Sequence, residues 1–272
     1  MKPYCFAKNG IIDSSKALVH PMDISVIRGY GIFDFFRTSN HVPLFLSDYL
    51  DRFIRSAEKT YLNLKYSKSE LADIILELIE KNDLKNGGIR MLLTGGVSEN
   101  HFSPSEGGLY IFCEDLLFPS QEKYDKGVKL VSADHVRSIA DIKTTNYAFP
   151  VWLSATWKDS GAEDVIYHHN GFISESSRSN IFVIKDGQIS TPDQHILHGI
   201  TRMRVLELAP QTSIRPISFE ELLAADELFI TSTTKKILPI TLIDDQKIGT
   251  GQVGPLTKKL MADFVEMEKK HI

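Results

Sequence analysis

A run of strand and turn signals between residues 162 and 202 constrains the fold of this chain more than any other feature. Short apolar segments there are separated by Asn170-Gly171 and Asp186-Gly187, dipeptides that favour the tight turns of β-hairpins. Thr191-Pro192 follows, and Gly199-Ile200-Thr201-Arg202 then predicts the start of a helix. The stretch therefore predicts successive strands joined by tight turns and followed by a helix.

The same region contains residue types that together suit one kind of chemistry. Lys143 lies in a short apolar and hydroxylic segment, Ile142-Lys143-Thr144-Thr145-Asn146-Tyr147. Glu175 ends a strand and leads into the Ser-rich turn before Asn180. Taken singly, a lysine and a turn glutamate are usually solvated surface residues. Combined with a Gly-Ile-Thr helix start, they could hold an aldehyde, a protonated ring nitrogen and a phosphate.

These residues resemble the class IV pyridoxal-phosphate enzymes, which have fold type IV. That family contains branched-chain aminotransferases, D-amino-acid aminotransferases and aminodeoxychorismate lyases. The resemblance runs over nearly the whole chain, and the segments that carry it occur in the family's order. They are Lys143, Glu175 to Asn180 with Phe182, Thr191-Pro192, Gly199-Ile200-Thr201-Arg202, and Thr231-Ser232-Thr233-Thr234 with Pro239.

The resemblance implies an α/β chain in two domains, an α+β two-layer N-terminal domain and an α/β pseudobarrel C-terminal domain, with the cofactor between them. We expect the first domain at residues 1–115 and the second, with the cofactor lysine, at residues 127–272. The polar residues 116–126 predict the linker. A homodimer is also implied, because each active site of the family is completed by the neighbouring subunit's first domain.

Two helices are predicted in the first domain from apolar residues at helical spacing. One begins at Leu46, with Ser47 as its N-cap, and keeps apolar spacing as far as Tyr61. The other spans residues 69–81. Arg90 lies in an otherwise apolar strand, and because an unpaired buried charge is costly, we expect it to meet an anion rather than solvent.

Composition excludes several other classes of protein. The chain has 272 residues, of which 42% are hydrophobic and 24% charged, as in globular proteins with a core. A net charge of −4 predicts no nucleic-acid partner. Cys5 and Cys113 have no CxxC neighbour, so no metal site or disulfide framework is predicted and a reduced, cytoplasmic location is expected. No apolar run reaches the roughly 18 residues of a membrane span, and no signal peptide is seen.

The family's cofactor, pyridoxal 5′-phosphate, implies roles for several residues. Lys143 would bind its aldehyde as a Schiff base and later act as the base that moves the substrate proton. Glu175 would keep the ring nitrogen protonated, which preserves the electron sink. Asn180 joins the cofactor-binding set. Either Tyr147 or Arg137 would hydrogen-bond the phenolic oxygen of the ring.

The phosphate of the cofactor is assigned to residues from separate segments. Arg52 stands where the family has a phosphate-binding arginine, and a guanidinium fork suits bidentate phosphate recognition. Ile200 and Thr201 open a helix whose first N–H groups and dipole favour an anion. Thr233 adds a hydroxyl.

The substrate residues are less closely matched to any one branch of the family. Phe33 is expected to face the substrate. The arginine that D-amino-acid aminotransferases carry in the loop after residue 94 is missing. We therefore predict a non-standard carboxylate trap built mainly from Arg28 of the partner subunit and Arg90, with Arg178 as a third candidate. Branched-chain members use a hydroxyl turn instead, which Thr234 could supply.

These inferences predict a pyridoxal-phosphate-dependent transaminase. It would move an amino group between an α-amino acid, with D-amino acids favoured, and a 2-oxo acid such as 2-oxoglutarate. The alternatives are a branched-chain L-amino-acid aminotransferase, an aminodeoxychorismate lyase that releases pyruvate, and a non-catalytic cofactor-binding homologue, which the intact Lys143 and Glu175 oppose.

Overall fold

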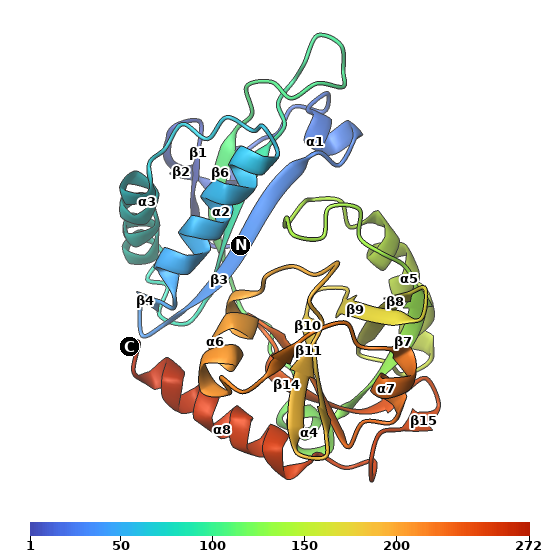
Figure 1. Ribbon diagram of the computed structural model, residues 1–272. Coiled ribbons are helices and arrows are strands. Elements are labelled where there is room, and N and C mark those ends of the chain that lie inside the picture. Colours follow the sequence, from blue (N-terminus) through green and yellow to red (C-terminus); the bar gives the residue numbers. More distant parts are fainter. The chain divides into compact units, whose positions relative to one another are not determined.

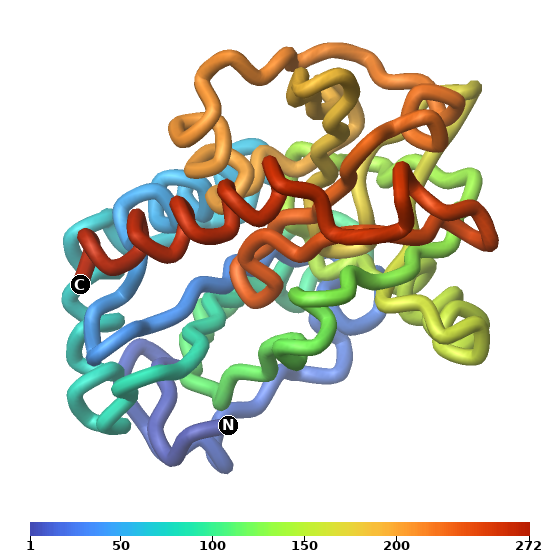
Figure 2. Tube along the Cα trace, turned by 90° about the horizontal axis from the view of Figure 1, so that it is seen from below, coloured from blue at the N-terminus to red at the C-terminus, as the bar shows by residue number.

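The computed structural model describes all of residues 1–272, and its chain divides into two compact units. Unit 1 contains Met1–Leu117, Ile142–Tyr147 and His271–Ile272, and unit 2 contains Phe118–Asp141 and Ala148–Lys270. Figures 1 and 2 follow the chain from the N-terminus in blue to the C-terminal helix in red.

Unit 1 is one antiparallel sheet covered by helices. Its six strands are ordered β2-β1-β6-β5-β3-β4. Its elements are β1 (Tyr4–Ala7), β2 (Gly10–Asp13), the 3-10 helix η1 (Ser14–Lys16), α1 (Ile24–Ile27), β3 (Gly31–Ser39), β4 (Val42–Pro43), α2 (Leu46–Lys59), α3 (Lys68–Lys81), β5 (Gly88–Thr94) and β6 (Leu109–Glu114).

The two faces of this sheet differ in character because side chains alternate along each strand. Asp34, Met91 and Ile111 are Cα partners across β3, β5 and β6, and all three are buried. They share the face on which α2 packs against β3 and α3 against β1 and β6 (Figure 1). Phe33 and Arg90 point to the opposite face, where they are only partly buried.

The start of α2 differs from the prediction. Phe45, in the left-handed conformation, occupies the N-cap, and no side chain caps the helix, so the assignment of Ser47 as N-cap is wrong. Ser47 lies inside the first turn and its Oγ accepts a hydrogen bond from Lys68 Nζ over 2.8 Å. The helix also ends at Lys59, and Tyr61 beyond it is 85% exposed, so Tyr61 does not continue the buried face.

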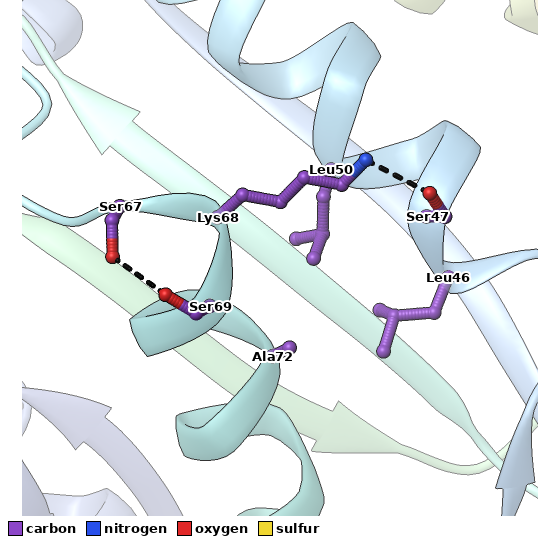
Figure 3. Close-up of a pocket in the computed structure, with 7 residues that line it drawn as sticks. All are labelled: Leu46, Ser47, Leu50, Ser67, Lys68, Ser69 and Ala72. Atoms are coloured by element: carbon purple, nitrogen blue, oxygen red, sulfur yellow. Dashed lines mark hydrogen bonds between the residues drawn. The ribbon is translucent and has the colours of Figure 1, made fainter.

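A hollow lies at the beginnings of α2 and α3 (Figure 3). Both apolar and hydroxyl side chains line it: Leu46, Ser47, Leu50, Ser67, Lys68, Ser69 and Ala72. Its only cation, on Lys68, already pairs with Asp51 over 2.6 Å. None of the residues predicted to bind cofactor or substrate lines this hollow.

Unit 2 is built around a nine-stranded sheet with helices on its outside. Its elements are α4 (Gln121–Lys126), β7 (Val128–Asp134), α5 (Ala148–Asp159), β8 (Asp164–His169), β9 (Phe172–Ser176), β10 (Asn180–Lys185), β11 (Gln188–Thr191), α6 (Ile200–Leu208), β12 (Ser213–Ile214), α7 (Phe219–Leu223), β13 (Glu227–Ser232), β14 (Lys236–Ile243), β15 (Gln246–Lys247) and α8 (Pro255–Lys269).

This sheet closes on itself. The strands run in the order β10-β13-β14-β7-β8-β9, and β9 pairs again with β10, which completes a ring. One buried apolar cluster draws members from every strand of the ring, among them Leu130, Ile166, Ile181 and Leu238, so it fills the interior. The predicted hairpin turns are present, with positive φ at Asn170-Gly171 and at Asp186-Gly187.

Helices cover the outside of the ring. Phe182 on β10 and Phe229 on β13 stack with ring centroids 4.8 Å apart, in a cluster that also contains residues of α6 and α8. A second outer cluster joins Trp157 of α5 to Tyr167 of β8. No helix of the chain combines the length and the apolar composition needed to cross a bilayer.

The two compact units differ from the expected domains in two places. The segment Ile142–Tyr147 belongs to unit 1 because Thr144 bridges Ile32 of β3, whereas the sequence had assigned Lys143 to the second domain. Within the expected linker, residues 116–126, the helix α4 packs on β14, so this stretch is partly ordered against unit 2.

Candidate active site

Lys143 lies beside the β3 strand of unit 1. Its carbonyl accepts a hydrogen bond from Phe33 N over 2.9 Å, and its Nζ is 4.6 Å from the centroid of the Phe33 ring. The side chain is half-buried. An aromatic face attracts an ammonium group and also limits the water around it. Phe33 therefore fixes both the backbone and the amine of the predicted cofactor lysine.

The segment that carries Lys143 is fixed further along by backbone contacts. Thr145 Oγ1 donates to Gly29 O over 3.0 Å, and its N–H donates to Gly31 O over 2.9 Å. A Cβ on Gly31 would lie 3.0 Å from Leu93 O and 3.3 Å from Thr145 Oγ1, so glycine permits this close approach. Tyr147 packs edge-on against Phe33, with centroids 5.7 Å apart.

Arg52 is 4% exposed and forms a bidentate pair with Asp34. Its Nε donates to Asp34 Oδ2 over 2.8 Å and its Nη2 to Oδ1 over 2.6 Å. Burial opposes the charge of Arg52, but the charge of Asp34 and its hydrogen bonds outweigh it, and the pKa of Arg52 is raised. The fork that the sequence assigned to a phosphate thus meets a carboxylate here, and the phosphate contact stays a prediction.

Arg90 pairs with the chain's own Glu114, and its contact with a substrate carboxylate stays a prediction. Nη2 of Arg90 and Oε1 of Glu114 are 2.6 Å apart. The guanidinium carbon also lies 4.8 Å from the Phe35 centroid and 5.5 Å from that of Phe33. Arg28, the other half of the predicted trap, is exposed and donates to Ile27 O over 3.2 Å.

Glu175, at the end of β9 in unit 2, is 3% exposed and accepts hydrogen bonds on both oxygens. Arg137 Nη1 donates to Oε1 over 2.7 Å. Leu197 N and Asn180 Nδ2 donate to Oε2 over 2.8 and 3.3 Å. A carboxylate surrounded by N–H donors is held as an acceptor. This arrangement suits a group that must accept a hydrogen bond from a protonated nitrogen.

Arg137 pairs with the carboxylate of Glu175 within unit 2. Its Nη1 donates to Glu175 and to the Ala140 carbonyl, the latter over 3.0 Å. Within unit 2, Arg137 therefore holds the carboxylate that was assigned to the ring nitrogen. The contact of Arg137 or Tyr147 with the phenolic oxygen of the ring stays a prediction.

The N-terminus of α6 offers an uncapped set of N–H groups. Gly199 is its N-cap and supplies no side chain, so the first N–H groups, at Ile200 and Thr201, have no partner within the helix. A Cβ on Gly199 would lie 2.2 Å from Asn180 Oδ1, so any side chain here would displace the Asn180 amide. Thr231, the Cα partner of Asn180, has a buried hydroxyl without a hydrogen-bond partner. Such an orphaned hydroxyl beside free N–H groups fits an anionic ligand such as a phosphate.

The remaining predicted residues lie on turns of unit 2. Thr233 and Thr234 form the turn between β13 and β14 and are half-buried. Arg178 lies on the turn between β9 and β10 and is exposed.

Sequence reasoning assigned no role to three buried charged residues of unit 2, of which only Arg202 belonged to a quoted segment. Arg202 is 6% exposed, bonds Thr191 Oγ1 and Pro192 O, and has its pKa lowered by burial. Asp164 and Lys235 form an ion pair that is 2.5 Å long. Their only sequence signals were a lysine directly after a hydroxyl run and an aspartate directly before an apolar strand.

Comparison with known proteins gives one consistent family. The model of a family described as Amino-transferase class IV matches residues 31–243. A putative branched-chain-amino-acid aminotransferase of Methanocaldococcus jannaschii is 32% identical, over 99% of this chain and 97% of its own. A D-alanine aminotransferase of Bacillus licheniformis is 32% identical, over 92% of each chain.

The fold of this chain is similar to the folds of solved structures. The branched-chain amino acid aminotransferase of a T.th. strain, solved with pyridoxamine 5′-phosphate, superposes with a TM-score of 0.92 at 21% identity, covering 100% of this chain and 96% of that one. This likeness and the closed sheet of unit 2 confirm the predicted fold class, fold type IV with a pseudobarrel.

Proposed function

The chain belongs to the class IV aminotransferase family, and on this premise we propose that it moves an amino group between an α-amino acid and a 2-oxo acid such as 2-oxoglutarate. It is an enzyme whose cofactor is pyridoxal 5′-phosphate. The observation that carries the proposal is Glu175, a buried strand-end carboxylate held by Arg137, Asn180 and a backbone N–H. A surface glutamate would not be held in this way.

The donor set fits this cofactor. Bound pyridoxal phosphate supplies an electron sink for the pair of electrons left when the Cα proton departs. We assign the aldehyde of the cofactor to the amine of Lys143. Glu175 offers an acceptor to a ring nitrogen, and the N-terminus of α6 with Thr201 and Thr231 suits a phosphate.

Each of several residues of the chain has its own role in the proposed reaction. Phe33 holds the Lys143 amine beside its own ring, and this amine would be the base that moves the substrate proton. Glu175 provides fixed negative charge that does not have to reorganise during the reaction. Arg137 and Asn180 keep that carboxylate in place. Thr233 and Thr234 remain candidates for the phosphate and the substrate carboxylate.

We favour D-amino acids as amino donors, with branched-chain L-amino acids as the alternative. Arginines of the kind predicted in the carboxylate trap, Arg28 and Arg90, would prefer α-amino acids to simple amines. The D-alanine and the branched-chain relatives are equally similar in identity, so each branch has support. An aminodeoxychorismate lyase activity is the third candidate.

The first experiment tests the cofactor lysine. Purified protein should be yellow, and borohydride should trap the cofactor on Lys143, located by peptide mass. Lys143→Ala protein should be colourless and inactive, whereas Lys185→Ala, which changes an exposed lysine of unit 2, should match wild type. Full turnover by Lys143→Ala would sink the assignment.

A substrate panel then separates the branches. L- and D-amino acids are offered with 2-oxoglutarate as acceptor, and aminodeoxychorismate is assayed separately for pyruvate release. Faster turnover of D-alanine or D-glutamate than of L-leucine supports the favoured reading, and the reverse order selects the branched-chain alternative. Pyruvate release without any transamination would overturn the proposed reaction.

Two further proposals concern assembly and location. We expect a homodimer, because the predicted trap takes Arg28 from the partner subunit, and light scattering at micromolar concentration would measure the mass.

We expect a cytoplasmic location, because Cys5 and Cys113 are both free and buried. Fractionation of the source cells would test this.

A further inference from the structure

A charged residue lies inside the closed sheet of unit 2. Asp164, the first residue of β8, is 0% exposed. It shares a strand face with Ile166, which belongs to the apolar cluster inside the ring, while Val165 and Tyr167 face the outer cluster with α5. Asp164 therefore points inward at one end of the ring, where a carboxylate needs a specific reason to be.

The two oxygens of Asp164 reach two different turns. Oδ2 accepts from Lys235 Nζ over 2.5 Å, and Lys235 is itself 5% exposed. Oδ1 accepts from Ser177 Oγ over 2.5 Å and from its neighbour Val165 N over 2.9 Å. One buried carboxylate thus ties the turn that contains Ser177 to the turn that contains Lys235.

Both turns carry residues assigned to the active site. Ser177 lies between Glu175 and Asn180, in the turn closed by a Ser176 N to Ser179 O hydrogen bond of 2.8 Å. Lys235 directly follows Thr233 and Thr234, in the turn that joins β13 to β14. Its N–H bonds Ser232 Oγ over 3.2 Å, so the lysine is fixed at both its backbone and its amine.

The charges of this cluster balance each other. Burial works to raise the pKa of Asp164, but the charge and hydrogen bond of Lys235, with the Ser177 hydroxyl, outweigh burial and lower it. A buried pair of this kind is weak support for stability, because apolar residues of similar volume often replace it without loss. A specific geometric role is therefore the better account of its presence.

We propose that Asp164, Lys235 and Ser177 are positioning residues that hold the Glu175–Asn180 turn and the Thr233–Thr234 turn in register for the cofactor. This rests on the proposed function, since it assigns those turns to the cofactor site. The three residues touch neither substrate nor cofactor. They act by fixing where Glu175 and the threonine hydroxyls lie.

The experiment uses variants that separate position from stability. Ser177→Ala removes the link to one turn and keeps the ion pair. The double variant Asp164→Asn/Lys235→Met removes both charges together, so neither is left buried alone. Ser177→Thr keeps a hydroxyl and should restore the link. Ser190→Ala, another buried serine of unit 2, and Lys185→Met, from an exposed ion pair, are the matched controls.

The readouts are the Kd for pyridoxal 5′-phosphate of the apoprotein, by absorbance titration, the melting temperature, and kcat and KM measured separately. Ser177→Ala and the double variant should raise the Kd about 10-fold or more and lower kcat, with melting temperatures close to wild type. Ser177→Thr and both controls should keep the wild-type Kd.

The outcomes are distinct. A wild-type Kd and kcat in a folded double variant and in Ser177→Ala would overturn the positioning role while leaving the proposed function intact. A double variant that unfolds, with Ser177→Ala at the wild-type Kd, would assign the pair to stability alone and also overturn it. Failure of the wild-type apoprotein to take up pyridoxal 5′-phosphate would instead overturn the proposed function and, with it, this inference.

Discussion

Arg137 Nη1 lies between Glu175 and the Ala140 carbonyl, at 2.7 Å from the carboxylate and 3.0 Å from the carbonyl oxygen. Ala140 precedes Lys143 by three residues in the sequence. One guanidinium nitrogen thus ties the strand-end carboxylate to the backbone that leads toward the lysine. This makes Arg137 a positioning residue of Glu175.

Replacing Arg137 should therefore act through Glu175. Hydrogen bonds to charged groups contribute about 1.5–3 kcal/mol, so Arg137→Leu should weaken binding of pyridoxal 5′-phosphate about 10- to 100-fold. A spectral titration of the apoprotein measures this. Arg215→Leu removes an exposed arginine from its 2.8 Å pair with Glu221 in the same unit and serves as control. Equal effects of the two substitutions would contradict a specific role for Arg137.

Glu175→Gln tests the carboxylate itself. The amide keeps the shape and can still accept from Leu197 N, but it lacks the charge that keeps a ring nitrogen protonated. Turnover should fall about 100-fold or more, because that charge acts on the transition state directly. Circular dichroism should show an unchanged fold. Near-wild-type turnover would mean that the partner of the ring nitrogen lies elsewhere.

The sequence predicted those parts of the fold that local patterns specify. The hairpin turns with positive φ at Asn170 and Asp186 and the helix that opens at Ile200 follow from turn chemistry and helix-start signals. Ring closure could not be read in this way. The pairings of β14 with β7 and of β10 with β13 join strands that lie far apart in the sequence, and no local residue pattern reports their contact.

The residues of the candidate site show the same difference between what local patterns specify and what packing across the fold decides. Lys143, Glu175 and Gly199 could be named because the resemblance to a family supplied their spacing. Their partners could not be named, because partners are set by packing across the fold. Arg52 meets Asp34, Arg90 meets Glu114, and Arg137 meets Glu175, each through a contact between segments that are separate in the sequence. A lone residue type in a sequence does not reveal which opposite charge will face it.

Cys113 is predicted to be unreactive in the folded protein. It is 0% exposed, and burial raises the pKa of its thiol to about 12. The thiolate is the reactive form, so at pH 8 the thiol is protonated as well as inaccessible. Native protein should show no labelling of Cys113 by iodoacetamide over an hour, and unfolded protein should be fully labelled. Rapid labelling at pH 8 without unfolding would contradict the buried position.

The Asp164–Lys235 pair predicts a specific acid sensitivity. The folded pKa of Asp164 lies below its ordinary value of 3.8, so the pair's contribution is fully present above that value and is lost as pH falls through the lower, folded pKa. Asp164→Asn leaves Lys235 buried without its partner and should cost about 3–5 kcal/mol near neutral pH. Urea unfolding measures both.

The double variant Asp164→Asn/Lys235→Met is the control for this prediction. It leaves no buried charge, so most of the lost stability should return, and the decline in unfolding free energy below about pH 4 should be shallower than in wild type. Unfolding curves with the same acid dependence in wild type and in the double variant would show that other carboxylates govern acid unfolding.

The arginine trap for the substrate carboxylate makes a kinetic prediction. Arg28→Ala and Arg90→Ala should each raise KM for an α-amino acid about 10- to 100-fold, the size of one or more charge-assisted hydrogen bonds. Both variants should turn over a primary amine that lacks the carboxylate at the wild-type rate. Arg55→Ala, which removes an exposed arginine of α2, should change neither donor.

Glu114 gives this prediction a second arm, because it already occupies Arg90 at 2.6 Å. If Arg90 serves the substrate, Glu114 competes with the substrate carboxylate, and Glu114→Gln should lower KM for α-amino acids while leaving the amine unchanged. If Arg90 only packs between Phe33 and Phe35 and pairs with Glu114, the same substitution should lower the melting temperature without changing KM. Equal losses toward both donors in Arg28→Ala and Arg90→Ala, or no loss in either, would show that the carboxylate binds elsewhere.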